Sequence, residues 1–167
     1  EINNEGEGII RLGDERFVVF VPDALPEEEV TCRIVRSKKN YATAKVIERH
    51  NDSPIRIKPL CPVYGKCGGC QLQALSYEKQ LEFKTSKVRG HLERIGGFTD
   101  IPMEKILGME QPFHYRNKAQ FPVGKSKDGR IITGFYAGRT HSIIENRDCA
   151  LGVTRNKEVL DRVIAHM

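Results

Sequence analysis

The 167-residue sequence contains no tryptophan, and its other aromatic residues are seven Phe and five Tyr. This supply is modest for one large hydrophobic core, so we expect two small cores instead. The sequence also lacks any apolar run close to the roughly 20 residues of a membrane-spanning helix. No signal-peptide pattern opens it. These absences exclude a membrane-spanning protein and favour a soluble chain of one or two small domains.

A strong net charge is also lacking, because 27 Lys and Arg stand against 22 Asp and Glu to leave +5. The basic residues are nevertheless clustered. Residues 33–49 hold six of them with Glu48 as the only acid, and residues 114–139 hold six with Asp128 as the only acid. Two basic segments favour a polyanionic partner, while a solvated basic surface is the alternative.

The cysteines do not form the even-numbered set that is typical of a secreted disulfide framework. There are five, and three of them lie within ten residues. An odd and clustered set argues against disulfides and favours a metal site in a cytoplasmic protein. The positions are Cys32, Cys61, Cys67, Cys70 and Cys149.

Cys61, Cys67 and Cys70 follow the spacing C-x5-C-x2-C, and Cys149 comes 79 residues later. Four thiolates suit either a tetrahedral zinc ion or a [4Fe–4S] cluster. Structural zinc usually takes its ligands as two short pairs, whereas here three ligands share one loop. A Gly-Gly pair inside the loop would also let backbone N–H groups approach inorganic sulfide. The pattern therefore favours the cluster, with zinc as the alternative, and predicts that these four cysteines converge.

The first 50 residues read as short strands rich in Val, Ile, Phe and Thr. The predicted strands are residues 8–12, 16–21, 30–36 and 41–49, with a tight hairpin turn at 13–15. Short strands without an intervening helix bury themselves best by closing into a small barrel. In the third strand Val30, Cys32 and Ile34 share one parity, so we expect Cys32 to be a buried small hydrophobe.

A Pro-punctuated connector over residues 51–60 follows this barrel. After the cysteine motif, Ser76 can cap a helix that runs to residue 95 and ends at a Gly-Gly pair. Strands are predicted at 115–123, 131–137 and 141–145, with turns at 124–129 and 138–139, and a helix at 156–167. The fold class is therefore mixed α+β. Its predicted parts are a barrel at 1–52, a connector and cysteine loop at 53–75, a long helix within 76–100 and an antiparallel β domain at 101–167.

The two basic segments supply the candidate contacts to a nucleic acid. The barrel candidates, suited to general contact with a phosphate backbone, are Arg33, Arg36, Lys38 and Lys39. In the later domain, Arg116 and Lys118 are expected to alternate on one strand face around Asn117, with Tyr136 offering a stacking surface. This mixture suits one particular RNA loop. The aromatic residues expected to pack in the core of the same domain are Phe121 and Phe135.

The cysteine motif reads Cys61-Pro62-Val63-Tyr64-Gly65-Lys66-Cys67-Gly68-Gly69-Cys70-Gln71-Leu72-Gln73. It closely resembles the iron–sulfur RNA (uracil-5-)-methyltransferases, a family best known for modifying 23S ribosomal RNA. The resemblance covers essentially the whole chain and continues through Ser76-Tyr77, Gln80-Leu81, Lys84, Leu92-Glu93-Arg94-Ile95-Gly96, Tyr115-Arg116-Asn117-Lys118, Phe121, Gly134-Phe135-Tyr136 and Cys149.

The N-terminal part resembles a TRAM domain, an RNA-binding barrel of the OB type, through Glu5-Gly6-Glu7-Gly8 and Phe20-Val21-Pro22. That domain usually has Pro-Gly-Glu where this sequence has Pro26-Glu27-Glu28. The missing glycine affects one turn and leaves the assignment unchanged.

The resemblance implies a [4Fe–4S] cluster on Cys61, Cys67, Cys70 and Cys149. It also implies S-adenosylmethionine as the methyl donor, with the nucleophilic cysteine and the base in a domain C-terminal to Met167. We therefore expect this chain to be a fragment without catalytic residues of its own. Its helix within 76–100 would pack against the absent methyltransferase domain, and without that cover its apolar stripe would invite self-association.

The predicted function is RNA recognition within a SAM-dependent RNA (uracil-5-)-methyltransferase that makes 5-methyluridine in 23S ribosomal RNA. The alternative is a non-catalytic RNA-binding module stabilised by zinc or by an iron–sulfur cluster. A ferredoxin-like electron carrier is a third reading, but such a carrier more often needs an acidic docking face. The predicted partners are RNA and the chain's own C-terminal methyltransferase domain, and no membrane.

Overall fold

The computed structural model describes residues 1–13, 17–138 and 140–167, which divide into two units. The first unit consists of Glu1–Lys58 and Ala74–Met103, and the second consists of Pro59–Gln73 and Glu104–Met167. The cysteine loop therefore belongs to the second unit and the long helix to the first. The sequence division at residues 52, 75 and 100 differs from this one, because a contiguous partition cannot show which segments pack together.

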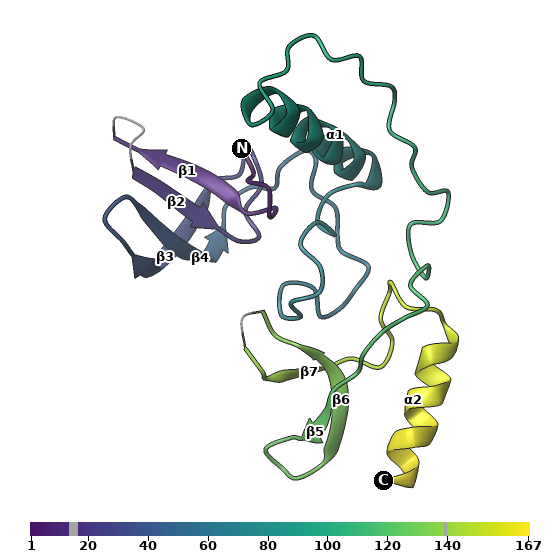
Figure 1. Ribbon diagram of the computed structural model, residues 1–167. Helices are drawn as coiled ribbons and strands as arrows, with labels where there is room; N and C mark the ends of the chain where they lie inside the picture. The colour runs from purple at the N-terminus through teal and green to yellow at the C-terminus, as the bar shows by residue number, and fades with distance from the viewer. Residues whose placement is uncertain (14–16, 139) are drawn as a thin grey trace. The chain divides into compact units, whose positions relative to one another are not determined.

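Four strands form the sheet of the first unit (Figure 1). They are β1 (Gly8–Leu12), β2 (Phe17–Val21), β3 (Val30–Ser37) and β4 (Tyr41–Arg49), in the order β1-β2-β4-β3. The pairs β1–β2 and β3–β4 are antiparallel, whereas β2 and β4 run parallel. The predicted strands are confirmed where the structure describes them. Arg16 and most of the turn at 13–15 lie outside the described residues.

One face of this sheet carries the core of the first unit. The residues that form it are Val19, Val21, Ala24, Ala42 and Ala44, each at most 5% exposed. Phe17, Cys32 and Val46 pack against this cluster from its rim. Cys32 is only half-buried, and burial raises the pKa of its thiol. Because side chains alternate along a strand, the intervening residues of β2 and β4 lie on the opposite face.

The sheet is more open than the expected barrel. Among the described residues no ladder joins β1 to β3, so these two strands are the edges of the sheet. The third strand keeps its predicted parity up to Ile34, which is opposite the buried Ala44, but Ile34 is 53% exposed on this edge strand. The register then shifts between Ile34 and Arg36. Such an irregularity leaves one residue of the strand without a partner and bends the strand locally.

Helix α1 (Tyr77–Arg94) starts and ends where the sequence signals predict. The Ser76 hydroxyl accepts a hydrogen bond from the Lys79 N–H at 3.3 Å, as an N-cap does. The chain leaves the helix through Gly97, whose φ of +69° favours glycine. Lys87 Nζ donates to the Asn4 carbonyl at 2.8 Å, which ties the helix to the N-terminal segment. No residue of α1 is buried. In its apolar stripe, Val88 and the following Ile95 are exposed, and the half-buried members are Tyr77, Leu81 and Leu92.

A buried carboxylate joins the connector to the sheet of the first unit. The Glu28 side chain is completely enclosed, whereas that of Arg56 is 10% exposed. Glu28 accepts hydrogen bonds from Arg56 Nε and Nη2, from Arg49 Nε at 3.2 Å and from two backbone N–H groups. Burial by itself would raise the pKa of Glu28, but the hydrogen bonds, led by that from Arg56, lower it from 4.5 to about 2.

We expect Glu28→Gln to destabilise the first unit by roughly 3 kcal/mol at neutral pH, because it removes the fully buried carboxylate that Arg56 and Arg49 share and leaves Arg56 with the half-exposed Asp23, at 3.2 Å, as its nearest partner. The folded-state pKa of Glu28 is depressed. Its contribution to stability is therefore fully present above about pH 4.5 and is lost as the pH falls towards 2. Urea unfolding followed by circular dichroism between pH 2 and 7 measures both effects.

Asp52→Asn is the matched control, because Asp52 is 72% exposed and lies 3.8 Å and 3.9 Å from the same two arginines. The control should change stability little, since exposed ion pairs contribute little. Equal stability of the Glu28→Gln variant and the wild type at every pH would contradict the assigned role of Glu28.

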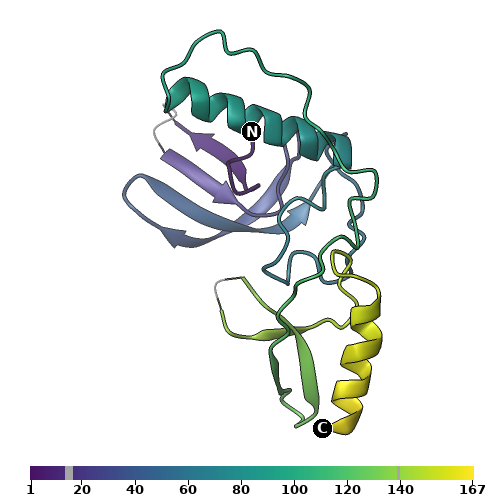
Figure 2. The same cartoon turned by 45° about the vertical axis from the view of Figure 1, so that its right-hand side comes forward.

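The second unit contains the sheet β5-β6-β7 and helix α2 (Figure 2). The strands are β5 (Val123–Lys125), β6 (Ile131–Tyr136) and β7 (Ile143–Glu145), all antiparallel, and α2 is Arg155–His166. Thr133 is fully buried in β6, and its hydroxyl donates to the Pro122 carbonyl at 3.0 Å. Phe121 and Phe135 are half-buried with ring centroids 4.8 Å apart, which confirms that they pack in the interior of this unit.

The predicted strand at residues 115–123 is wrong for most of its length. Only its last residue belongs to β5, and the preceding segment is irregular. Arg116 instead forms an isolated parallel bridge with Gly152. Its N–H donates to the Leu151 carbonyl at 2.8 Å, and its carbonyl accepts from the Val153 N–H at 3.2 Å. Arg139, in the predicted turn at 138–139, lies outside the described residues.

Neither helix within the described ranges combines the length and the apolar character that crossing a membrane would require.

Candidate cysteine centre and nucleic-acid interface

The second unit contains four of the five cysteines. Cys61, Cys67 and Cys70 lie on the loop Pro59–Gln73, and Cys149 follows β7. The loop is held against β6, because the Gly68 N–H donates to the Tyr136 carbonyl at 3.0 Å and Cys67 forms a bridge with Ala137. Cys32 belongs to the first unit.

The four thiols of the second unit lie close enough to influence one another. Burial is the main cause that raises the pKa of Cys67, and the neighbouring Cys61 and Cys149 raise it further. Burial likewise raises the pKa of Cys70 most, with added repulsion from Cys149, Cys67 and Cys61. The fold thus places these four thiols within electrostatic range of one another, and their role as ligands of one metal site stays a prediction.

Three of these sulfurs accept hydrogen bonds from amide groups. The Gly69 N–H donates to Cys67 Sγ at 3.4 Å and Gln73 Nε2 donates to Cys70 Sγ at 3.3 Å. Asn146 Nδ2 donates to Cys61 Sγ over a longer 3.9 Å. Gln73 also accepts from the Cys61 N–H at 3.2 Å through its Oε1.

Sequence reasoning assigned no role to Gln73 and did not single out Asn146, although both are at most 8% exposed. A sequence signal existed for Gln73, which stands three positions after the Cys70 whose sulfur it contacts. None existed for Asn146, because its partner Cys61 is 85 positions away in the sequence. A small offset of this kind lets an amide side chain fold back on a neighbouring sulfur.

Within residues 1–13, 17–138 and 140–167, no group of three or more His, Cys, Asp or Glu side chains is arranged around a metal ion. The thiols therefore lie near one another without forming a tight coordination shell.

In the first unit, the predicted RNA contacts all lie on the β3–β4 hairpin. Arg33 and Arg36 are on β3, and Lys38 and Lys39 are in the turn that follows. All four side chains are exposed, and no described residue forms an ion pair with any of them. Their charge is therefore available to a polyanion.

In the second unit the predicted RNA contacts are less well assembled. Arg116, Asn117 and Lys118 are exposed, but they lie on the irregular segment and do not alternate on a strand. The Arg116 guanidinium lies 5.9 Å from the centroid of the Tyr115 ring, a cation–π distance. Tyr136 is 44% exposed and packs against His141 with ring centroids 5.3 Å apart. No contact found among the described residues joins Tyr136 to the 116–118 segment.

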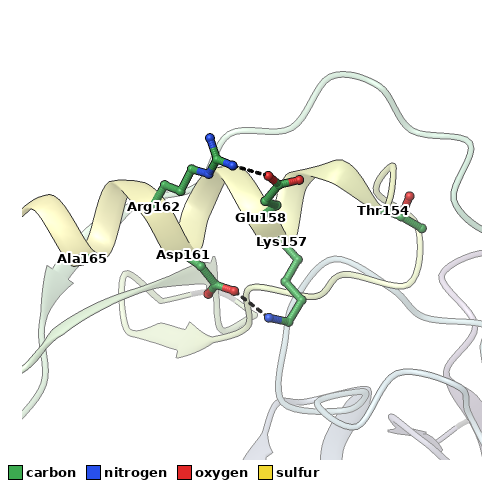
Figure 3. Close-up of a pocket in the computed structure, with 6 residues that line it drawn as sticks. All are labelled: Thr154, Lys157, Glu158, Asp161, Arg162 and Ala165. Carbon is green, nitrogen blue, oxygen red and sulfur yellow. Dashed lines mark hydrogen bonds and ion pairs between the residues drawn. The ribbon is translucent and has the colours of Figure 1, made fainter.

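A shallow hollow of about 540 Å³ runs along α2 and is lined by Thr154, Lys157, Glu158, Asp161, Arg162 and Ala165. Figure 3 shows that its charged side chains pair with one another. Lys157 Nζ lies 2.6 Å from Asp161, and Arg162 Nη2 lies 2.6 Å from Glu158. Pairs at i,i+4 like these are typical of a solvated helix face, and the hollow supplies no candidate chemistry.

Comparison with known proteins agrees with the division into units. Residues 1–47 match the family model of the TRAM domain. A Bacillus cereus protein named as an uncharacterized RNA methyltransferase is 40% identical over 163 residues, which cover 98% of this chain and 35% of that protein. A Clostridium tetani protein with the same name is 44% identical, with 98% and 34% coverage.

A solved structure is also similar, the Pyrococcus abyssi tRNA (uracil-54, C5)-methyltransferase in complex with S-adenosyl-L-homocysteine. It is 26% identical with a TM-score of 0.55, and the match covers 96% of this chain and 36% of that one. The chain thus spans about a third of the length of the relatives that it matches. It is homologous to RNA methyltransferases and carries a TRAM-like N-terminal segment.

Proposed function

We propose that the chain is the RNA-recognition portion of a SAM-dependent RNA (uracil-5-)-methyltransferase. The observation that carries this proposal is the similarity, over 96% of the chain, to a uracil-5-methyltransferase structure that holds S-adenosyl-L-homocysteine. An enzyme that modifies a base within folded RNA must extrude that base and hold the surrounding strand. The exposed Arg and Lys side chains of the β3–β4 hairpin can hold the strand by contacting its phosphates.

The whole enzyme would use S-adenosylmethionine, which would bind outside this 167-residue chain. The thiols of Cys61, Cys67, Cys70 and Cys149 gather in one place, and Cys32 packs against the sheet core.

The 167-residue chain is expected to bind structured RNA but neither to bind S-adenosylmethionine nor to transfer its methyl group. Fluorescence anisotropy with a labelled RNA hairpin, repeated at several salt concentrations, measures the first property. Isothermal titration calorimetry with S-adenosylmethionine measures the second. Affinity for RNA should fall steeply with salt, because each phosphate neutralised releases condensed counterions.

Micromolar affinity for S-adenosylmethionine would contradict the proposal that the methyl donor binds outside this chain. Absence of binding to any RNA at low salt would overturn the proposed function itself.

We also propose that Cys61, Cys67, Cys70 and Cys149 hold a [4Fe–4S] cluster. The donor set fits this group, because it offers four neighbouring thiols and amide N–H groups that donate to three of the sulfurs. When bound, the cluster would cross-link the cysteine loop to the segment after β7. Binding the cluster would require the loop to adjust, since the described thiols are not spaced to hold a metal ion.

The proposed substrate is a uridine in ribosomal RNA, which the resemblance of the cysteine motif favours. The proposed location of the protein is the cytoplasm. The similar solved structure is named for tRNA uracil-54 instead. Competition between unlabelled 23S ribosomal RNA fragments and tRNA for the same labelled hairpin distinguishes the two substrate classes.

A further inference from the structure

The outer face of the first unit's sheet, opposite its core, carries two aromatic rings. Val19, Val21, Ala42 and Ala44 point into the core, so Phe20 and Tyr41 belong to the other face. The register supports this placement, because Val18 is the partner of Tyr41 and Phe20 is the partner of Thr43.

Phe20 and Tyr41 form one aromatic pair across β2 and β4. Their ring centroids are 6.0 Å apart and their planes are inclined by 64°, an edge-to-face contact. Phe20 is half-buried, whereas Tyr41 is 40% exposed. An exposed ring fixed by a neighbouring ring offers a preorganised flat surface, and stacking partners of that kind bind unpaired bases.

Basic side chains belong to the same outer face. On the neighbouring strand pair, Arg36 is opposite Thr43, which in turn is the partner of Phe20. Arg33 is opposite Lys45, one same-face step further along β4. Arg33, Arg36 and Lys45 are exposed, and none forms an ion pair with a described residue. A row of Arg and Lys beside an aromatic platform is a charge pattern suited to a nucleic-acid backbone.

The turn between β3 and β4 extends this positive surface to Tyr41. The Lys38 N–H donates to the Tyr41 carbonyl at 2.8 Å, so the turn that holds Lys38 and Lys39 closes directly next to the ring. Two acids of the same unit, Asp23 and Glu28, form ion pairs with Arg49 and Arg56 and not with Arg33, Arg36 or Lys45.

We propose that this outer face, defined by Phe20, Arg33, Arg36, Tyr41 and Lys45, binds single-stranded RNA by stacking bases on the Phe20–Tyr41 pair. The basic side chains would neutralise the adjacent phosphates. The inference rests on the proposed RNA-recognition function and deepens it by naming the form of RNA and the surface. A duplex keeps its bases stacked inside and would engage only the charges.

The absence of tryptophan from the sequence makes a direct test possible. In a Tyr41→Trp variant of the 167-residue chain, the introduced indole is the only tryptophan signal. Its fluorescence should be quenched by a single-stranded oligouridine, because a stacked base contacts the ring. Phe98→Trp is the matched control, since Phe98 is 58% exposed in the same unit but lies after α1. Its fluorescence should not change.

Affinity measurements complete the test. Tyr41→Leu should weaken binding of the oligouridine by a factor between about 5 and 150, the range found when one stacking ring is removed. Tyr41→Phe retains the ring and should bind as tightly as the wild type, which separates stacking from hydrogen bonding by the hydroxyl. Circular dichroism establishes that each variant is folded.

The outcomes separate the two proposals. If the wild type binds no RNA, the proposed function fails. If it binds RNA but Tyr41→Trp is not quenched and Tyr41→Leu binds normally, the outer-face proposal fails alone. Tighter binding to a duplex of equal length than to the single strand would also overturn it. Loss of oligouridine binding in Tyr41→Leu with retention in Tyr41→Phe supports it.

Discussion

Iron and acid-labile sulfide are expected to fall from about four of each per chain to near zero when Cys149 is replaced by Ser. Cys149 is the one ligand that comes from outside the cysteine loop. A hydroxyl is a poor substitute for a thiolate toward iron, so three sulfurs on one flexible loop would remain. The measurement is chemical analysis of chains purified without oxygen, with the visible absorbance of the cluster as a second readout.

Cys32→Ser is the matched control, because Cys32 belongs to the first unit and packs against its core. This variant should retain its full complement of iron and sulfide. Equal iron content in the Cys149→Ser and wild-type chains would refute Cys149 as a ligand. If the wild-type chain contained stoichiometric zinc and no sulfide, the four cysteines would be assigned to a zinc site and not to an iron–sulfur cluster.

Gly134→Ala is expected to destabilise the second unit by about 3 kcal/mol or more, because the added methyl group meets backbone atoms. A Cβ at Gly134 would lie 2.0 Å from the Ile144 carbonyl oxygen and 2.6 Å from the Asn146 nitrogen. Backbone on the neighbouring strand cannot move aside without separating β6 from β7. The change should lower Tm by roughly 10 °C or more, as measured by thermal unfolding.

Gly124→Ala provides the comparison within the same sheet. Its Cβ would lie 2.8 Å from Ile143 Cδ1, the end of a flexible side chain that can rotate away. We therefore expect a much smaller loss of stability at this position. Similar Tm values for the Gly134→Ala and wild-type chains would show that the strands approach less closely than described.

The proposed cluster and the proposed RNA surface belong to different units of the chain. The cysteine loop and the segment after β7 are in the second unit, and the Phe20–Tyr41 pair is in the first. Removing the cluster should therefore leave oligouridine binding by the outer face largely intact, provided that the first unit stays folded.

Local signals in the sequence predicted the first unit's strands and helix well. The four strands are short stretches rich in Val, Ile, Phe and Thr, and the hairpin β3–β4 joins neighbours in the chain. Ser76 caps α1 through a hydrogen bond to a residue only three positions away. Interactions of such short range are visible in the order of the residues, since they need no distant partner.

The segment at 115–123 shows where this reasoning fails. Its residue types suit a strand, but the backbone groups of Arg116 find their partners at Leu151 and Val153. A strand needs a continuous neighbour that pairs along its length, and the distant 151–153 segment pairs only briefly. Tertiary context thus overrode a β-propensity that was weak on its own.

The sequence by itself selected the four cysteines of the proposed cluster, because their spacing is a property of the chain, and their role as ligands stays a prediction. It also determined the basic character of the β3–β4 hairpin. Only the tertiary structure decided that Gln73 and Asn146 donate to the sulfurs and that Phe20 meets Tyr41. The reason is that β2 and β4 are neighbours in the sheet but are separated in the sequence by β3, so their parallel register depends on how the whole sheet folds.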